Sequence, residues 1–224
     1  MKLSVVIPFY NEENMIQKMY DELVKEINQI TKAEFEIIFI NDGSKDRTFE
    51  RMLAIAAGDS RVKYISFSRN FGKEAGTIAG LEYATGEAVI LMDGDLQHPP
   101  AMLPQMIEAY EQGYDVVSAR RTRTGEKPHR TFLAKHFYKL ANKMMDIELM
   151  DGVSEFRLFS RKVVNAIISM QEYNRFSKGI FAWIGFNEKV IEYENQVRTV
   201  GETKYSLKFS LNYAIQGILS FNDK

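Results

Sequence analysis

The 224-residue sequence contains no cysteine, a single tryptophan and only five prolines, and its formal net charge is −1. Without cysteine the chain has no disulfide scaffold, no thiolate metal site and no cysteine nucleophile. A net charge near zero provides no global attraction to nucleic acid, so we expect no nucleic-acid partner. No apolar run reaches the roughly 18–20 residues that span a bilayer. Met1 and Lys2 lead directly into Leu3–Ile7, which is too short for a signal peptide, so we expect the chain to start in the cytosol.

The composition that is present is typical of one globular domain, with 45% hydrophobic and 26% charged residues. Short apolar runs alternate with longer helical patterns through the first half of the chain. The runs that predict strands are Leu3–Pro8, Phe35–Ile40, Val62–Phe67, Ala88–Met92 and Asp115–Ser118. The patterns that predict helices are Glu12–Ile30, Asp46–Ala57, Lys73–Ala84 and Pro100–Gln112. This alternation predicts a doubly wound α/β domain with a parallel sheet and right-handed crossovers.

Ligands of such sheets bind beyond the carboxyl ends of the strands. Asp93 and Asp95 directly follow the most apolar predicted strand. Residues two apart in an extended segment point the same way, so both carboxylates can face one cation. Their hard oxygens suit Mg²⁺ or Mn²⁺, which bridges diphosphate oxygens, and Gln97 offers a further carbonyl oxygen. The alternative is an acidic turn that is only solvated.

Three other segments follow predicted strands at the same edge. Asp42 has two interpretations, as an acceptor for a base or ribose group and as a helix N-cap. Tyr10 and Glu12 place an aromatic ring and a carboxylate after the first strand. Lys73 follows Gly72 at a predicted helix start, an arrangement that suits an anion.

A basic segment begins after Ser118. Between residues 120 and 143 Glu126 is the only acid, and the lysines and arginines are Arg120, Arg121, Arg123, Lys127, Arg130, Lys135, Lys139 and Lys143. Apolar residues recur at helical spacing from Phe132 to Met144. Such a helix can lie in a membrane interface, and the alternative is a core-packing helix with a solvated lysine face. Leu207–Phe221 is another apolar helical pattern, too short to span a bilayer.

Four ordered motifs together carry a family resemblance. They are Ser4–Glu13, Asn41–Ser44, Arg69–Ala75 and Met92–Pro100. They resemble the family 2 glycosyltransferases of GT-A fold and, more narrowly, the polyprenyl-phosphate glycosyltransferases. The later segments Asn174–Phe181, Trp183–Phe186 and Gly201–Ser206 resemble the bacterial branch, the undecaprenyl-phosphate glucosyltransferases. The resemblance covers nearly the whole chain.

This resemblance implies a metal-dependent, inverting transfer of a hexose from a UDP-sugar to a polyprenyl (undecaprenyl) phosphate. The implied nucleotide-sugar contacts are Pro8, Tyr10, Glu12, Asp42, Lys73, Asp93 and Gly94. The implied Mg²⁺ or Mn²⁺ ligands are Asp93, Asp95 and Gln97. Arginines suit the acceptor phosphate because they bind it in bidentate fashion, and the candidates are Arg120, Arg121, Arg123, Arg130 and Lys204. The expected catalytic set is Asp93, Asp95, Arg120, Arg123 and Glu155.

The expected organisation is a nucleotide-sugar-binding half, residues 1–120, and an acceptor-binding, membrane-associating half of the same GT-A domain, residues 121–224. The family's bacterial members usually continue into two transmembrane helices. We expect a protein at the cytoplasmic face of the plasma membrane with any transmembrane anchor absent from this chain, which is then either a truncated form or a peripheral variant. A homo-oligomer is compatible with this organisation.

Two departures from the family pattern stand out. Asp93-Gly94-Asp95 replaces the common Asp-Ala-Asp and should leave the ligands intact. Ser154-Glu155-Phe156-Arg157 replaces Gly-Asp-Phe-Arg, so Glu155 either positions the acceptor or forms an ion pair with Arg157.

Two other functions compete with this interpretation. A soluble transferase onto a glycan or protein hydroxyl would need a carboxylate base. A non-catalytic nucleotide-sugar-binding protein is expected to lose a metal carboxylate, yet both are present. No Gly-x-Gly-x-x-Gly motif follows the first strand, which disfavours a dehydrogenase.

Overall fold

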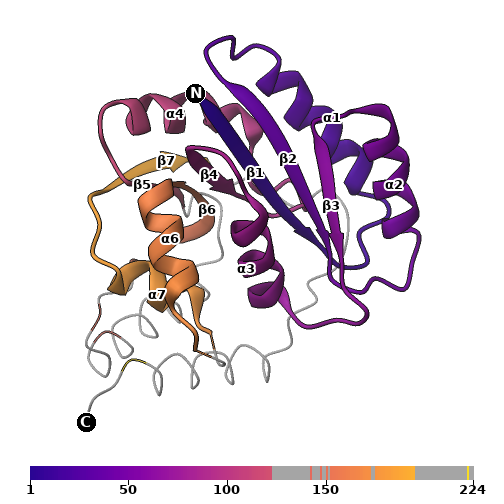
Figure 1. Ribbon diagram of the computed structural model, residues 1–224. Helices are drawn as coiled ribbons and strands as arrows, with labels where there is room; N and C mark the ends of the chain where they lie inside the picture. The colour runs from indigo at the N-terminus through magenta and orange to yellow at the C-terminus, as the bar shows by residue number, and fades with distance from the viewer. Residues whose placement is uncertain are drawn as a thin grey trace.

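One mixed sheet organises the chain in the computed structural model, which describes residues 1–122, 142, 147, 150, 152–172, 175–194 and 221 (Figure 1). The strands are β1 (Lys2–Phe9), β2 (Glu34–Asn41), β3 (Val62–Ser66), β4 (Ala88–Leu91), β5 (Val116–Arg121), β6 (Val153–Ser160) and β7 (Glu188–Tyr193). The helices are α1 (Ile16–Ile27), α2 (Thr48–Gly58), α3 (Lys73–Tyr83), the 3₁₀ turn η1 (Pro100–Met102), α4 (Leu103–Glu111), α6 (Arg161–Ser169) and α7 (Ser177–Trp183).

The strand order is β3-β2-β1-β4-β6-β5-β7. β1 pairs in parallel with β2 and β4, β2 with β3, and β5 with β7. The five predicted strands and the mostly parallel sheet are therefore confirmed. The antiparallel member of the sheet is β6, which lies between β4 and β5 and pairs with both in the antiparallel sense. Ser154, Glu155 and Arg157 interrupt the apolar residues at the start of β6, so its sequence lacks the apolar run that marks β1, β2 and β4.

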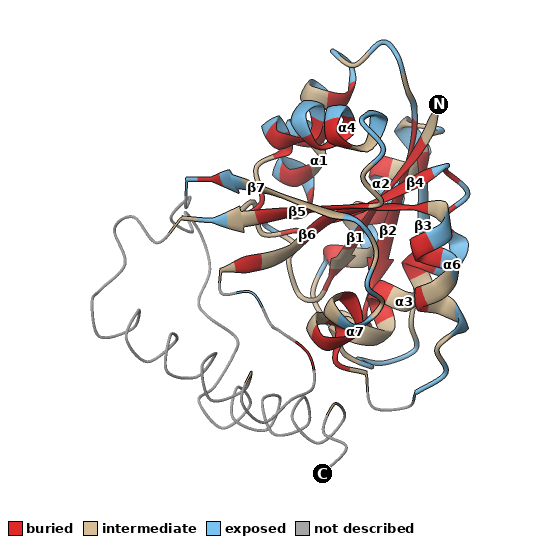
Figure 2. Cartoon of the chain, turned by 90° about the vertical axis from the view of Figure 1, so that its left-hand side faces the viewer, coloured by how far each residue is buried: buried red, intermediate tan, exposed pale blue. Residues whose placement is uncertain are grey.

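Both faces of the sheet are covered by helices, as Figure 2 shows with the sheet seen nearly edge-on. Val5 and Ile7 of β1 pack with residues of α1, α2 and α4. The intervening Val6 packs with residues of α3, α6 and α7. Successive side chains of a strand point to opposite faces, so a strand buried on both sides is mostly apolar. This requirement explains the nearly continuous apolar runs of β1, β2 and β4.

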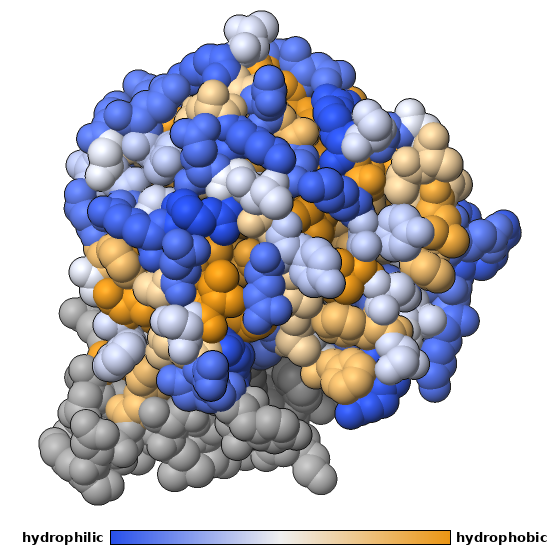
Figure 3. Space-filling view, in the orientation of Figure 1, coloured by the Kyte–Doolittle hydropathy of each residue, from blue (hydrophilic) through white to orange (hydrophobic). Residues whose placement is uncertain are grey.

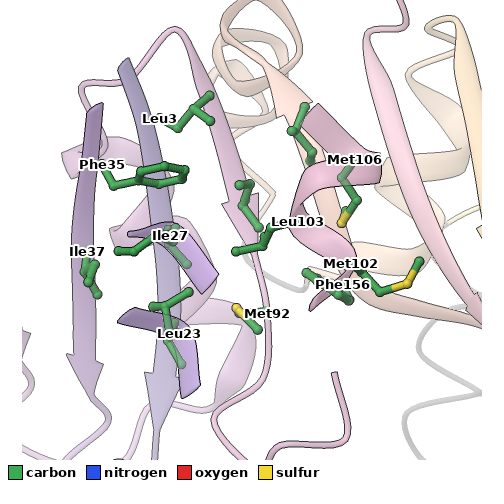
Figure 4. Close-up of a cluster of buried hydrophobic side chains, with 14 of the residues drawn as sticks. Leu3, Leu23, Ile27, Phe35, Ile37, Met92, Met102, Leu103, Met106 and Phe156 are labelled. Atoms are coloured by element: carbon green, nitrogen blue, oxygen red, sulfur yellow. The ribbon is translucent and has the colours of Figure 1, made fainter. Parts of the chain in front are cut away.

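The larger of the two buried clusters fills the α1–α2–α4 side of the sheet (Figure 4). Leu23 and Ile27 of α1 approach Ile37 and Phe35 of β2, while Leu103 of α4 lies beside Met92. The buried residues of α1 are Ile16, Met19, Leu23 and Ile27, spaced three or four apart on one face. Burial of each such side chain stabilises the fold by roughly 1.5–3 kcal/mol.

The predicted helices are confirmed with shifted ends. α1 begins at Ile16 rather than Glu12, and residues 13–15 form a turn in which the Glu12 carbonyl accepts the N–H groups of Met15 at 2.9 Å and Ile16 at 3.1 Å. The predicted helix at Pro100 begins with the 3₁₀ turn η1 before α4.

Several expectations concern residues outside the described ranges. They include the basic segment from Arg123 onward and the pattern Leu207–Phe221, apart from residues 142 and 221. Among the helices of the described ranges, none is both long enough and apolar enough to cross a bilayer.

The surface of the face seen in Figure 3 is largely hydrophilic in its upper part, with hydrophobic residues interspersed below.

Candidate active site

The loops after β1 and β2 meet at the carboxyl edge of the sheet, toward which the arrowheads of β1, β2 and β3 point (Figure 1). The backbone N–H of Asn11 donates to Ser44 Oγ at 3.0 Å, and the N–H of Lys45 donates to Asn11 Oδ1 at 2.8 Å. Asn11 has a φ of 51°, a left-handed conformation that asparagine tolerates better than most residues. These contacts fix the loop that contains Tyr10 and Glu12 beside Asp42.

Asp42 connects the loop after β2 to the loop after β3. Its carboxylate accepts the backbone N–H of Phe71 at 2.7 Å and of Gly72 at 3.0 Å. Asp42 is only 3% exposed, and this burial raises the pKa of its carboxyl group despite the two hydrogen bonds. The sequence suggested a nucleotide contact or a helix N-cap for Asp42. It did not suggest that the Asp42 carboxylate holds the loop after β3.

The turn after β4 is built around His98. The backbone N–H of Asp93 donates to His98 Nδ1 at 3.0 Å, and the imidazole stacks on Phe156 of β6 with ring centroids 5.3 Å apart. Burial lowers the pKa of His98 more than nearby Asp93 raises it, which keeps the ring neutral and Nδ1 available as an acceptor. Within the same turn Asp95 Oδ1 accepts the N–H of Gln97, and Leu96 has a φ of 59°, which is unfavourable for a leucine.

Lys73 joins the turn after β4 to β6. Its ammonium lies 2.5 Å from Asp93 Oδ1 and 2.7 Å from Glu155 Oε2. Burial of the ammonium disfavours its charge, but the two carboxylates outweigh this effect and raise the pKa of Lys73 above its ordinary value. Burial likewise favours neutral Asp93, and Lys73 reverses that effect and lowers the pKa of Asp93. Lys73 and Asp93 are therefore both charged at neutral pH.

The donor set fits a divalent metal that also binds substrate phosphate. Within the described ranges, no cluster of three or more His, Cys, Asp or Glu side chains forms a metal site by itself. Mg²⁺ usually keeps several waters and binds through one or two carboxylates plus phosphate oxygens, so the carboxylates of Asp93 and Asp95 could hold it without a third.

The acceptor-site residues predicted from the sequence are described only in part. Arg120 lies at the carboxyl end of β5, and its guanidinium pairs with Glu192, its register partner on β7. Arg121 is the last residue of β5 and is exposed. Arg123, Arg130 and Lys204 lie outside the described ranges.

Glu155 and Arg157 do not pair with each other. Glu155 contacts Lys73, whereas Arg157 Nη1 lies 3.2 Å from Glu188 Oε1 of β7 and its guanidinium lies over Phe181 of α7. The alternative of a Glu155–Arg157 ion pair is therefore wrong. Arg157 is buried, and Glu188 provides its counter-charge within the sheet.

Lys178 of α7 had no role in the sequence prediction, although it belongs to the segment 174–181. Its charge contributes to the lowered pKa of Asp93, after Lys73 and His98. The preceding Ser177 donates to Glu74, the neighbour of Lys73 in α3. The sequence signal that could have indicated a role for Lys178 was its position as a basic residue within a family motif.

The arrangement of sheet and site defines a class of protein, an α/β fold of GT-A type. Glucosyl-3-phosphoglycerate synthase from Mycobacterium tuberculosis has the same fold, with a TM-score of 0.65 and 19% identity over 97% of this chain and 77% of that chain. A mannosyltransferase from Pyrobaculum calidifontis gives a TM-score of 0.61 with 18% identity, over 85% of this chain and 54% of the other.

The family model for glycosyl transferase family 2 matches residues 4–168, and the chain belongs to this family. The protein CsbB from Bacillus subtilis is 50% identical over 99% of this chain and 67% of its own length. The bactoprenol glucosyl transferase of Shigella phage SfX is 42% identical over 99% of this chain and 73% of its own length.

Proposed function

We propose that this protein transfers a hexose from a UDP-sugar to a polyprenyl phosphate with inversion at the anomeric carbon. The observation that carries this proposal is the cluster at the carboxyl edge of the sheet, where Lys73 contacts both Glu155 and Asp93, the latter in the turn that also contains Asp95. Relatives named bactoprenol glucosyl transferases, about 42% identical over nearly the whole chain, support the polyprenol acceptor and glucose as the sugar.

The proposed donor site lies across the first four strands. Pro8, Tyr10, Glu12 and Asp42 would hold the nucleotide, with Lys73 and Gly94 near the sugar diphosphate. Asp93, Asp95 and Gln97 would hold Mg²⁺ or Mn²⁺, and this ion would supply positive charge that neutralises the diphosphate and favours departure of UDP. Support for a metal comes from structures of the same fold that contain Mn²⁺ with GDP-mannose or UDP-glucose.

The proposed acceptor needs no strong general base. A phosphate monoester has a second pKa near ~6 and is already anionic at neutral pH. One of its oxygens attacks the anomeric carbon, and the bond from that carbon to the diphosphate oxygen breaks with its electron pair on UDP. The protein's task is to gather two anionic reactants, and arginines suit the second of them. Arg120, Arg121, Arg123, Arg130 and Lys204 are the proposed acceptor-phosphate contacts.

The proposed acceptor site adjoins a membrane surface. The basic segment that follows β5 would bring the arginines and the apolar residues Phe132 and Phe137 to anionic head groups at the cytoplasmic face. Flotation with anionic liposomes tests this: the Phe132→Ala/Phe137→Ala variant should float less than the wild type, and undiminished flotation would reject the interfacial role.

One observation favours a second candidate, transfer to a hydroxyl of a glycan or protein. Glu155 is a carboxylate with only 13% exposure beside Asp93, and such a group can act as a general base. One assay of acceptor use separates the polyprenyl-phosphate acceptor from the hydroxyl acceptor. Radiolabelled UDP-glucose and UDP-N-acetylglucosamine are incubated with a short-chain polyprenyl phosphate or with soluble glycans, and lipid-linked label is extracted into organic solvent. Label in the organic phase supports the proposal, and label only on the soluble acceptor supports the second candidate.

A further inference from the structure

The ammonium of Lys73 lies against the carboxylate of Asp93, a proposed metal ligand, where a metal ion would otherwise bind. Its Nζ contacts Oδ1 of Asp93 and Oε2 of Glu155 at 2.5 and 2.7 Å. The three side chains come from separate elements, namely the start of α3, the turn after β4, and β6. They are 29%, 30% and 13% exposed in the order Lys73, Asp93 and Glu155, so bulk water screens their charges only partly.

The backbone of Lys73 is anchored on both sides. The residues before it, Phe71 and Gly72, donate their N–H groups to buried Asp42. The residue after it, Glu74, accepts hydrogen bonds from the backbone and hydroxyl of Ser177 in α7. The ammonium can therefore change partners only by rotation about its own flexible four-carbon stem, while α3 stays in place.

A divalent cation at Asp93 would meet a positive charge that already neutralises the same carboxylate. Two like charges a few ångströms apart repel strongly where solvent screening is incomplete. A nucleotide diphosphate changes this balance, because its oxygens offer the ammonium a new anionic partner. Lysine is well suited to such an exchange, since it binds phosphate as a compact point charge with rotatable donors.

We propose that Lys73 is a resident counter-ion of the metal site and couples metal binding to nucleotide binding. Without nucleotide, the ammonium holds Asp93 and weakens the binding of free metal. With a nucleoside diphosphate bound, the ammonium moves to phosphate and Asp93 becomes a full metal ligand. This inference rests on the proposed function and adds to it an order of events: metal binds tightly only together with the donor.

The test measures Mn²⁺ affinity by the electron paramagnetic resonance signal of free Mn²⁺, with and without UDP and corrected for Mn²⁺ held by UDP alone. In the wild type, UDP should increase the affinity for Mn²⁺. In Lys73→Met, the affinity without UDP should rise ~10-fold or more because the competing charge is gone. The further increase caused by UDP should shrink, since the two binding events are no longer coupled through the lysine.

Two variants serve as controls. Lys73→Arg keeps the positive charge and should retain weak Mn²⁺ binding without UDP. Lys63→Met also removes one ion pair, because Lys63 lies 2.7 Å from buried Glu36. This pair lies near the amino ends of β2 and β3, so the variant should leave Mn²⁺ affinity unchanged. Thermal unfolding establishes that each variant is folded. Should Lys73→Met not fold, Lys73→Gln, which is neutral but keeps a hydrogen-bonding group, takes its place.

The outcomes separate the inference from the proposed function. If the wild type binds Mn²⁺ and the folded neutral variant binds it no more tightly, the role of Lys73 is wrong while the metal site stands. If neither protein binds Mn²⁺ even with UDP, both the proposed metal site and the inference fail.

Discussion

Gly94 and Phe9 are matched in size at the centre of the candidate site. A Cβ atom at position 94 would lie 2.3 Å from Cε1 of Phe9, closer than any real contact of such atoms. The Phe9 ring is 1% exposed and packs edge-on against Phe39 with centroids 5.2 Å apart, so it has little room to move away. The glycine between the two aspartates is therefore required by the aromatic residue at the end of β1.

Gly94→Ala should destabilise the protein and displace the aspartates. Overpacking of a well-filled core typically costs about 1–3 kcal/mol. Thermal unfolding should show this loss, and activity should fall further than the lost stability explains, because Asp93 and Asp95 flank the altered residue.

Gly58→Ala is the matched control, since a Cβ at this last residue of α2 would meet no atom within 4 Å. That variant should be neutral or slightly stabilising. The double variant Phe9→Leu/Gly94→Ala should lose less stability than the sum of the two single changes. A Gly94→Ala variant as harmless as Gly58→Ala would contradict the proposed packing conflict.

His98→Phe should lower both stability and activity. The phenyl ring keeps the stack on Phe156, but the backbone N–H of Asp93 loses its acceptor, and an unsatisfied buried donor costs about 1–3 kcal/mol. His98→Asn offers Oδ1 in place of Nδ1 and should recover part of the loss. Chemical denaturation and turnover measurements check this, and equal behaviour of the two variants would show that the hydrogen bond is unimportant.

Asp95→Asn should reduce turnover by ~100-fold or more while the fold is preserved, since in the proposed function Asp95 holds the metal that would stabilise the diphosphate leaving group. Asp21→Asn on α1 is the control, as Asp21 only accepts a hydrogen bond from Gln17 on an exposed face. Assays at saturating Mn²⁺ or Mg²⁺ are required. Wild-type turnover of Asp95→Asn under those conditions would exclude Asp95 as a ligand.

Stability should fall in acid because of Glu36 on β2. Burial favours its neutral form, but hydrogen bonds from Lys63, Ser4 and Thr85 outweigh this and lower its pKa from 4.5 to about 2. The stabilisation is therefore complete above pH ~4.5 and is lost progressively as the pH falls toward ~2. Its size is at most about 3 kcal/mol.

Glu36→Gln should therefore lower the free energy of unfolding at pH 7 and make it less dependent on pH between about 4.5 and 2. Glu34→Gln, at an exposed position on the same strand, is the control. Denaturant titrations at several pH values measure both. An unchanged acid dependence in Glu36→Gln would refute this assignment.

The sequence predicted more of the first half of the fold than of the second. Mostly apolar runs marked β1, β2, β4 and β5 because both of their faces are buried, and this requirement is local and visible. β6 and β7 were missed because charged side chains on them are paired only by residues distant in the sequence, as Arg157 is by Glu188. No local pattern reveals such a partner.

The amino-acid sequence by itself determined the alternation of strands and helices and the position of Asp93 and Asp95 at a strand's carboxyl end, because both depend on neighbours within a few residues. Only the tertiary structure decided that β6 enters between β4 and β5. This insertion brings Glu155 to Lys73 and Phe156 under His98. The physical reason is that the place of a strand in a sheet depends on how both faces are buried by the whole chain, which local spacing does not encode.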